Sequence, residues 1–354
     1  MVELEGSRME ARVVIEHNHP LSSSIAERRQ WNSHNRIDQT TRNLIRNLRS
    51  NNVQLSRVCS VVGTLHGGGE YIPFRRQSIR SLCGKLAQES IESDMEKTVS
   101  LFTEMKAKDN GLVVHVDLDD EKRIRSLLWC HGRGRENYKA FGDAVTFDTT
   151  YRTNLYNLPF GIFVGVNNHF QSTVFGAVLL TEETTSAFQW CFRSFVEAMG
   201  NQCQAMRAAI SSELPNTRHR WCKWHVLRRA KESLGPLYTK NSGFKRALHE
   251  ILDEVVSSSE FENKWEQLVE HYGLENNSFL RRAFYNRAMW AKPYFTETFC
   301  AGMTSTQRSE SANHMLKTYI SRSAPMHVFV EQYNRMIADR DADEAREEHA
   351  TKQV

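Results

Sequence analysis

The pattern of apolar and polar positions predicts a sheet in the middle of the chain. Residues 144–148 alternate apolar and polar side chains before an acid, and the runs 160–167 and 173–180 are apolar and rich in β-branched and aromatic residues. A polar turn at 167–169 joins these two runs, which predicts a hairpin. The segment HVDLDD at 115–120 predicts a further short strand and a polar turn.

Helical periodicity follows the predicted sheet. Apolar residues recur every three to four positions over 187–199 and 203–214, and residues 240–300 continue this pattern. The charged segment 339–349 predicts a solvated helix or a frayed end. Residues 22–60 are rich in Ser, Asn, Gln and Arg, which predicts a mobile polar stretch with room for one helix. Strands followed by helices indicate an α/β sheet domain with a helical appendage.

The composition excludes several classes of protein. The 354 residues include 46 Lys and Arg and 42 Asp and Glu, and the formal charge of +4 excludes a uniformly basic nucleic-acid coat but not a local basic patch. No apolar run reaches the length of about 20 residues that spans a bilayer, and the start, MVELEG, predicts no secretory signal. Seven scattered cysteines, an odd number, indicate a reducing compartment, either cytosol or nucleus.

Two acids stand at positions where chemistry is possible. Asp148 follows an apolar strand in the sequence FDTTY, and a carboxylate at such a sheet edge can hold a divalent metal, although a solvated acid that caps a turn explains this spacing more often. Glu310, in TQRSESAN, falls in the first turn of a predicted helix, opposite its apolar stripe, where the helix dipole favours an acid. Thr304 and Gln307 predict a capping box for that helix.

The densest basic segment of the chain is 218–231, which interleaves cations with two tryptophans. This mixture suits phosphates and stacked bases, but a solvated helix face with core tryptophans has the same pattern. Within it, Cys222-x-x-His225 has half of a zinc-site spacing, for which structural packing is a better explanation than metal binding. The candidate nucleic-acid contacts are Arg218, Arg220, Lys223, Arg228, Arg229 and Lys231.

A pair of histidines near the start is the remaining candidate for metal binding. A β-like run ends in His17-x-His19-Pro20, a pairing that occurs at the end of some zinc modules. A structural zinc site needs four ligands, and the first cysteine of the chain is Cys59. Nothing upstream completes the site, so we expect weak or absent zinc binding by the N-terminal segment.

Several segments together resemble one protein family. These segments are EHNHPL, FGDAVTFDTTYRTN, PFGIFVGVNNH, TRHRWCKWHV, AGMTSTQRSESAN and FVEQYNRMIADR. In this order they resemble the plant far-red-impaired-response-related family, which comprises transcription regulators domesticated from Mutator-like transposases. The resemblance covers about residues 11–340, and several motifs in the right order are more specific than any one of them.

The resemblance implies a domain organisation. Residues 111–320 resemble an RNase H-like, transposase-derived α/β core with a mostly helical insertion at about 236–300. Residues 1–22 resemble the C-terminal remnant of a zinc-binding DNA-recognition domain. Residues 23–110 are then a polar linker and connecting region, and residues 321–354 are a charged helical tail.

The resemblance also implies roles for single residues. In active relatives, three acids of the core bind two metal ions for strand cleavage and joining. Matched by motif, Asp148 is the first of these acids and Glu310 is the third. Cys222 and His225 belong to the same core and support it structurally, whereas the histidines at 17 and 19 are remnants of zinc ligands.

Departures from the family pattern predict a truncated or internally spliced member, or an incomplete gene model. No aspartate occurs between Asp148 and Asp253, and the helices predicted at 187–199 and 203–214 leave no room for the strand that carries the family's second acid. The cysteine half of the zinc module and the C-terminal zinc finger are missing as well. Two-metal chemistry depends on the full set of carboxylates, so we expect no enzyme activity.

The function implied by the resemblance is that of a nuclear transcription regulator with a role in light-linked gene control. An active or decayed Mutator-like transposase is one alternative, and a DNA-independent interaction partner of full-length relatives is another. Expected partners are DNA, bound weakly or through another protein, and copies of the chain or its relatives in an oligomer, but no membrane. The family uses zinc, the missing ligands argue against it here, and no organic cofactor is expected.

Overall fold

The computed structural model describes residues 2–5, 8–11, 22, 24–28, 30, 36–68, 71–151, 153–200, 217–239, 243–303 and 307–352. The chain divides into two compact units, residues 1–94 and 95–354. Three sequence predictions fall outside the described residues: the zinc-ligand remnants His17 and His19, the helix at 203–214, and the Thr304 end of the capping box. Among the helices described, none combines the length and apolar character that a bilayer span requires.

The first unit is built mainly of helices. Its elements are the strands β1 (Val2–Glu5) and β2 (Arg8–Ala11) and the helices α1 (Ile25–Arg28), α2 (Gln39–Ser50), α3 (Leu55–Leu65) and α4 (Arg76–Ile91). The two strands form an antiparallel hairpin. Helices α2, α3 and α4 contact one another and share a buried apolar core that includes Ile45, Val58, Val62, Phe74 and Ile79.

These packed helices correct the expectation of a mobile polar stretch at 22–60 within a polar linker at 23–110. Asp38 caps α2, because its carboxylate accepts the backbone N–H of Thr41 at 2.9 Å. Ile45 of the same helix is fully buried. The Ser, Asn, Gln and Arg residues lie mainly on the exposed faces, and their abundance conceals the narrow apolar stripe that each helix buries.

The second unit contains a five-stranded sheet. Its strands are β3 (Val113–Leu118), β4 (Ile124–Cys130), β5 (Thr146–Thr150), β6 (Phe160–Val166) and β7 (Ser172–Leu180). Their order in the sheet is β3-β4-β7-β6-β5, and every neighbouring pair is antiparallel. Among the residues that the structure describes, β3 and β5 are therefore the edge strands.

The structure confirms the predicted strands and adds one. The runs expected at 144–148, 160–167 and 173–180 are β5, β6 and β7 to within two residues. Asn167 shapes the turn between the last two, and its side chain accepts the backbone N–H groups of residues 169 and 171. Strand β4 was missed, because its run at 127–130 is buried on both faces of the sheet and lacks the alternation of a half-exposed strand.

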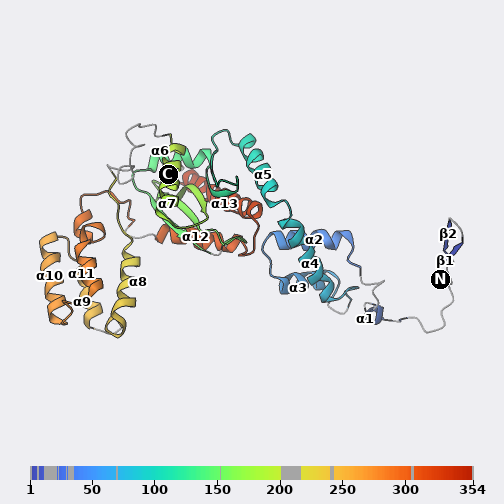
Figure 1. The fold of residues 1–354 in the computed structure, drawn as a ribbon, viewed down its shortest axis with the longest axis horizontal. Helices are drawn as coiled ribbons and strands as arrows, with labels where there is room; N and C mark the ends of the chain where they lie inside the picture. Colours follow the sequence, from blue (N-terminus) through green and yellow to red (C-terminus); the bar gives the residue numbers. More distant parts are fainter. Residues whose placement is uncertain are drawn as a thin grey trace. The chain divides into compact units, whose positions relative to one another are not determined.

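Helices cover both faces of this sheet and give a layered α/β arrangement (Figure 1). They are α5 (Asp94–Lys108), α6 (Gly132–Phe141), α7 (Thr185–Ala198), α12 (Gln307–Tyr319) and α13 (Met326–Lys352). On one face, Phe160 and Ile162 pack against α12 and α13. On the other, Phe163 stacks on Phe195 of α7, with ring centroids 3.8 Å apart. The helix predicted at 187–199 is thus confirmed as α7.

The helical insertion expected at about 236–300 is a group of short helices with its own core. Its members are α8 (Lys223–Leu234), η2 (Gly235–Tyr238), α9 (Gly243–Asp253), α10 (Ser258–His271), α11 (Ser278–Tyr285), η3 (Arg287–Met289) and η4 (Lys292–Phe295), where η marks 3-10 helices. Phe244, Phe261 and Trp265 are buried at its centre. Helix α8 belongs to this core through Ala230 and Leu234, so the group begins before residue 236.

Helix α13 corrects the expectation of a charged tail at 321–354. In its first half, Phe329, Val330, Tyr333 and Met336 are buried against the sheet. These side chains recur at helical spacing, and together they complete the core on one face of the sheet. The charged second half of α13 also contacts the rest of the second unit, through Arg340 and Glu344.

Candidate functional site

Asp148 occupies the middle of the edge strand β5. It lies opposite Ile162 of β6 in the antiparallel register, on the sheet face that α12 covers. Neighbouring positions along a strand point to opposite faces, so Phe147 packs on the α7 side with Phe163 and Phe192. The strand thus buries an aromatic ring on one face and presents a carboxylate on the other.

Helix α12 meets this strand with polar as well as apolar side chains. Ser309, which is fully buried, donates its hydroxyl hydrogen to Thr146 Oγ1 at 3.1 Å. One turn later, Asn313 Nδ2 donates to Asp148 Oδ2 at 3.4 Å. Ala312 and Leu316 fill the apolar core beside them. Together these contacts fix the first turns of α12 against β5.

The acids singled out by the sequence, Asp148 and Glu310, therefore lie near each other and are called the acidic pair below. Burial is the main cause that raises the pKa of Asp148, and the negative charge of Glu310 adds to it. The positive charge of His225 and the hydrogen bond from Asn313 act in the opposite direction, but the pKa of Asp148 remains above its ordinary value. Glu310 is half-buried and faces this site, which corrects its expected place on a solvated face.

The donor groups at the acidic pair do not fit two divalent ions. A two-metal site needs several carboxylates to neutralise ions about 3.5–4 Å apart. Within the described part of the chain, no three His, Cys, Asp or Glu side chains are grouped so that they can hold a metal ion. The same finding covers Cys222 and His225 at the start of α8, which belong to no such group of three among the described residues.

The expected nucleic-acid contacts of the basic segment divide into two sets. In the first set, Arg218 donates to Tyr294 O at 2.8 Å and Thr298 Oγ1 at 3.0 Å. Arg218 and Arg220 also both lie over the ring of Phe295, and Lys223 pairs with Asp253. These three cations are used within the helical group.

The second set lies on the exposed surface of α8. Arg228 and Arg229 share Glu232 at 3.2 and 4.0 Å, and Lys231 is exposed. Trp221 and Trp224 are 37% and 48% exposed, so neither is a core residue. The alternative that both tryptophans belong to the core is thus wrong, and their role in binding remains a prediction.

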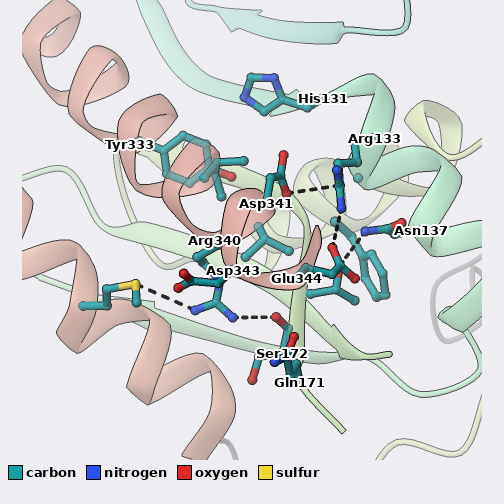
Figure 2. Close-up of a pocket in the computed structure, with 16 residues that line it drawn as sticks. His131, Arg133, Asn137, Gln171, Ser172, Tyr333, Arg340, Asp341, Asp343 and Glu344 are labelled. Carbon is teal, nitrogen blue, oxygen red and sulfur yellow. Dashed lines mark hydrogen bonds and ion pairs between the residues drawn. The ribbon is translucent and has the colours of Figure 1, made fainter. Parts of the chain in front are cut away.

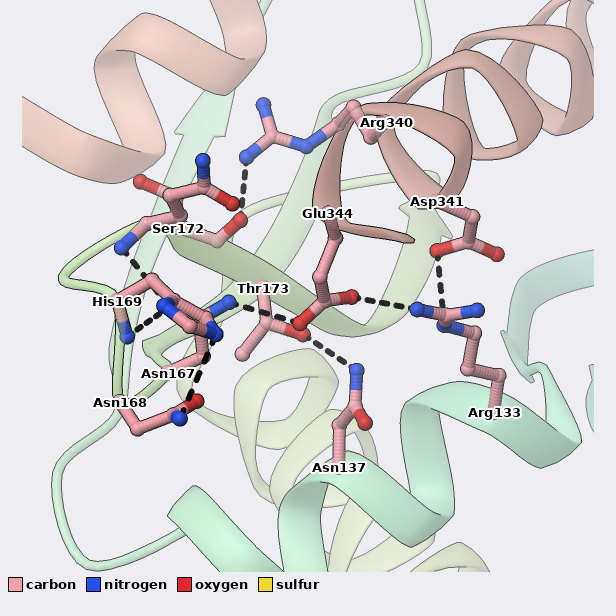
Figure 3. Close-up of polar contacts among 11 residues, drawn as sticks. Arg133, Asn137, Asn167, Asn168, His169, Ser172, Thr173, Arg340, Asp341 and Glu344 are labelled. Carbon is pink, nitrogen blue, oxygen red and sulfur yellow. Dashed lines mark hydrogen bonds and ion pairs between the residues drawn. The ribbon is translucent and has the colours of Figure 1, made fainter. Parts of the chain in front are cut away.

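A second polar cluster, which sequence reasoning missed, surrounds a cavity of about 270 Å³ between α6, the β6–β7 turn and α13 (Figure 2). Arg133 pairs with Glu344 at 2.8 Å and with Asp341 at 3.3 Å. Asn167 donates to the same Glu344 carboxylate at 2.8 Å, and Asn137 donates to Thr173 (Figure 3). We call these residues, without Thr173, the Arg133–Glu344 cluster.

The Arg133–Glu344 cluster compensates the charge of Glu344 but not fully that of Asp341. Burial alone would raise the pKa of Glu344, but the hydrogen bonds from Asn167 and Arg133 outweigh it and leave this pKa below its ordinary value. Asp341 has its pKa raised by burial despite the nearby Arg133. Arg340 donates to the carbonyl oxygen of Ser172 on β7. These contacts hold the second half of α13 against the sheet, so the cluster has a structural role.

The sequence of the chain is similar to those of several known proteins. Residues 144–229 match the family described as MULE transposase domain. The chain is 30% identical over 328 residues to Protein FAR1-RELATED SEQUENCE 5 of Arabidopsis thaliana, which covers 90% of this chain and 42% of that protein. It is 30% identical over 263 residues to Protein FAR-RED IMPAIRED RESPONSE 1 of the same plant, with 72% of this chain and 32% of the relative covered.

A further relative matches a larger share of this chain. Protein FAR1-RELATED SEQUENCE 4 of Arabidopsis thaliana is 29% identical over 343 residues, which covers 94% of this chain and 46% of that protein. The chain thus spans less than half the length of these curated relatives. The matches confirm the family expected from the sequence motifs.

Proposed function

Since the chain belongs to the far-red-impaired-response-related family, we propose that it is a nuclear transcription regulator derived from a Mutator-like transposase, and that it cleaves no DNA. The proposed role in light-linked gene control rests on the likeness to the relative FAR-RED IMPAIRED RESPONSE 1, whose name refers to a far-red response. The observation that carries the proposal is the acidic pair, which keeps its place beside the sheet without a third metal ligand in the described residues.

An RNase H-like origin of the core is part of this proposal. An acid on an edge strand and a second acid on a helix packed against that strand support such an origin. The match of residues 144–229 to the transposase domain covers β5, β6, β7 and α7. The helical group that follows is the counterpart of the family's helical insertion.

The charge balance at the acidic pair supports the proposed loss of catalysis. Two divalent ions carry four positive charges, and Asp148 and Glu310 together supply two negative ones. The chain has no aspartate from Thr149 to Leu252 that could add a third. Mutual repulsion of the ions is then poorly offset, so their affinity and any strand-cleavage rate are strongly reduced.

A direct test of the regulatory proposal uses the full chain in plant protoplasts. A fluorescent fusion is expected to accumulate in the nucleus, and chromatin immunoprecipitation is expected to recover discrete promoter fragments. Expression of a light-responsive reporter should change when the chain is supplied. A fusion that stays outside the nucleus and leaves the reporter unchanged would contradict the proposal.

A second test addresses chemistry. Purified protein with Mg²⁺ or Mn²⁺ is expected to leave a labelled terminal-repeat duplex uncut. Metal-dependent nicking that disappears in Asp148→Ala would show an active transposase instead. DNA binding measured with and without a full-length relative then separates a DNA-contacting regulator from a pure interaction partner, since the latter binds only in the mixture.

A further inference from the structure

We propose that helices α2, α3 and α4 form a helix-turn-helix that binds duplex DNA, with α3 as the helix that enters the major groove. This inference rests on the proposed regulatory function and deepens it, because it names the surface that contacts DNA. The set α2–α4 is called the three-helix module. All of its helices lie within the first unit and within the described residues.

The connection between α2 and α3 has the length of a helix-turn-helix. Helix α2 ends at Ser50 and α3 begins at Leu55, so the turn comprises residues 51–54. Within it, Asn52 adopts a left-handed conformation with φ 59°, which reverses the chain sharply, and asparagine tolerates this conformation. Helix α4 then packs across both α2 and α3. Three-helix versions of this motif present one helix to the DNA in the same way.

Helix α3 divides cleanly into a buried and an exposed face. Val58 and Val62 are fully buried against α2 and α4. The opposite face exposes Ser56, Arg57, Ser60, Val61, Thr64 and Leu65. Short hydroxyl side chains and an arginine on one helix face are the groups that reach base edges and phosphates, and small apolar groups contact thymine methyls. Among the described residues of the first unit, these side chains are open to solvent.

The charge of the three-helix module favours a polyanion. Residues 36–91 contain nine Lys and Arg and three Asp and Glu, a formal charge of +6, whereas the whole chain carries +4. The remainder of the chain is therefore slightly acidic. Six of these cations have no carboxylate within ion-pair distance among the described residues and are exposed: Arg36, Arg46, Arg57, Arg76, Arg80 and Lys85.

A hollow beside α3 adds a second cationic contact. A cavity of about 680 Å³ lies between α3 and the start of α4, and Ser60 and Thr64 line it on one side. Arg75 and Arg76 line it at the first turn of α4. Arg75 donates to the carbonyl oxygen of Gln30, whereas Arg76 is exposed. A DNA backbone that follows α3 in the groove would meet the Arg76 guanidinium, so a phosphate contact flanks the face that reads bases.

The basic segment 218–231 is a weaker candidate for the same role. Arg218, Arg220 and Lys223 are engaged within the helical group, and Arg228 shares Glu232 with its neighbour. The exposed pair Arg228 and Arg229 tests this competing segment, and the matched control is the exposed pair Arg281 and Arg282 of α11. It offers the same change of charge on a helix outside the three-helix module.

The test measures binding of the full chain to a labelled random-sequence duplex over a salt series. In Arg57→Glu with Arg76→Glu, we expect the slope of log affinity against log salt to fall by about 2, with affinity about tenfold lower or more. The milder pair Arg57→Gln with Arg76→Gln should give a smaller loss in the same direction, and it guards against misfolding. The control Arg281→Glu with Arg282→Glu should leave the slope unchanged, Arg228→Glu with Arg229→Glu should change it less than Arg57→Glu with Arg76→Glu, and circular dichroism should match the wild type throughout.

A second readout separates base recognition from phosphate binding. Ser60→Ala with Thr64→Ala should keep the salt slope but change the sequences that the chain selects from a randomised duplex pool. Loss of binding in the Arg228 and Arg229 variant alone, or tighter binding to single-stranded RNA of the same sequence, would overturn the inference.

The two proposals fail in different ways. Wild-type protein that binds no duplex DNA overturns the DNA-binding role of the three-helix module, whereas nuclear regulation through a partner can still be observed in protoplasts. Conversely, salt-dependent binding that requires Arg57 and Arg76 in a protein that never enters the nucleus supports the three-helix module and overturns the proposed function.

Discussion

The acidic pair and the Arg133–Glu344 cluster are both polar sites set against the same sheet, but they differ in how their charges are balanced. At the acidic pair, two carboxylates face each other, and the pKa of Asp148 is raised. In the Arg133–Glu344 cluster, a guanidinium lies between two carboxylates, and the pKa of Glu344 is lowered. The charge of Asp148 is under-compensated, as at a site derived from metal chemistry. The charge of Glu344 is balanced by its hydrogen-bond donors, as a structural contact requires, although burial keeps the pKa of neighbouring Asp341 raised.

The largest expected effect comes from removing the balanced carboxylate of Glu344. Glu344 is only 12% exposed and accepts from both Arg133 and Asn167, so Glu344→Ala removes the acceptor of Asn167 and leaves Arg133 with Asp341 alone. We expect a loss of about 2 kcal/mol, which lowers the unfolding midpoint by about 4–8 °C. Calorimetry or the fluorescence of the buried tryptophans measures it. Glu347→Ala, on the exposed side of the same helix, is the control and should stay near the wild type.

At the acidic pair, removal of a carboxylate charge is expected to raise the unfolding midpoint instead of lowering it. Burial makes the ionised form of Asp148 unfavourable, so Asp148→Asn removes a charge that the fold holds at a cost. At neutral pH we expect a small stabilisation, with a midpoint about 1–2 °C higher, because about 0.5 kcal/mol moves a domain of this size by that amount. Exposed Asp143→Asn is the control. A clear destabilisation by Asp148→Asn alone would show that the carboxylate has a structural role after all.

At acid pH, the free energies of unfolding of the Glu344 and Asp148 variants should approach that of the wild type, one from below and the other from above. The contribution of Glu344, whose pKa is lowered in the fold, is present above its unfolded pKa and is lost as the pH falls through the folded value. The penalty at Asp148, whose folded pKa is raised, is present at neutral pH and disappears as the pH falls through that raised value towards 3.8. Free energies of unfolding for the wild type, Glu344→Gln and Asp148→Asn between pH 7 and about pH 3 should converge. Parallel curves would contradict the pKa directions.

The smallest expected effect is a change in the pKa of Asp148 when His225 is replaced, which tests whether this histidine lies near the acidic pair. The charge of His225 lowers the pKa of Asp148, so His225→Gln should raise this pKa further. Carbon-13 labelling of the aspartate carboxyl groups allows the titration to be followed by NMR. His219→Gln, which removes an exposed histidine of the same basic segment, should leave the titration of Asp148 in place.

Parts of this molecule could be predicted from the sequence for identifiable reasons. Strands β6 and β7 have continuous apolar runs and a turn that begins at Asn167, so local pattern was sufficient. Asp148 and Glu310 were matched to site acids through motif order, since the local pattern around each also fits a solvated acid. Strand β4 was missed because a doubly buried strand lacks alternation. Residues 22–60 were expected to hold at most one helix, because the thin apolar stripes of helices such as α2 disappear in a polar composition.

The Arg133–Glu344 cluster shows where such prediction ends. Its partners are contributed by α6, the β6–β7 turn and α13, and no spacing along the chain links them. Segment 339–349 reads as a charged surface helix when taken alone. The tertiary fold, which local sequence patterns do not reveal, brings Asn167 and Arg133 to the same carboxylate of α13.

The place of α13 in the chain has a consequence for synthesis on the ribosome. The sheet is complete in sequence once β7 ends at Leu180, yet the helix that seals one of its faces begins at Met326. Until Phe329 and Tyr333 leave the exit tunnel, the nascent chain holds Trp129 and Phe160 without their final cover. The second unit therefore closes late, and its nascent form should engage chaperones that recognise exposed aromatic surface.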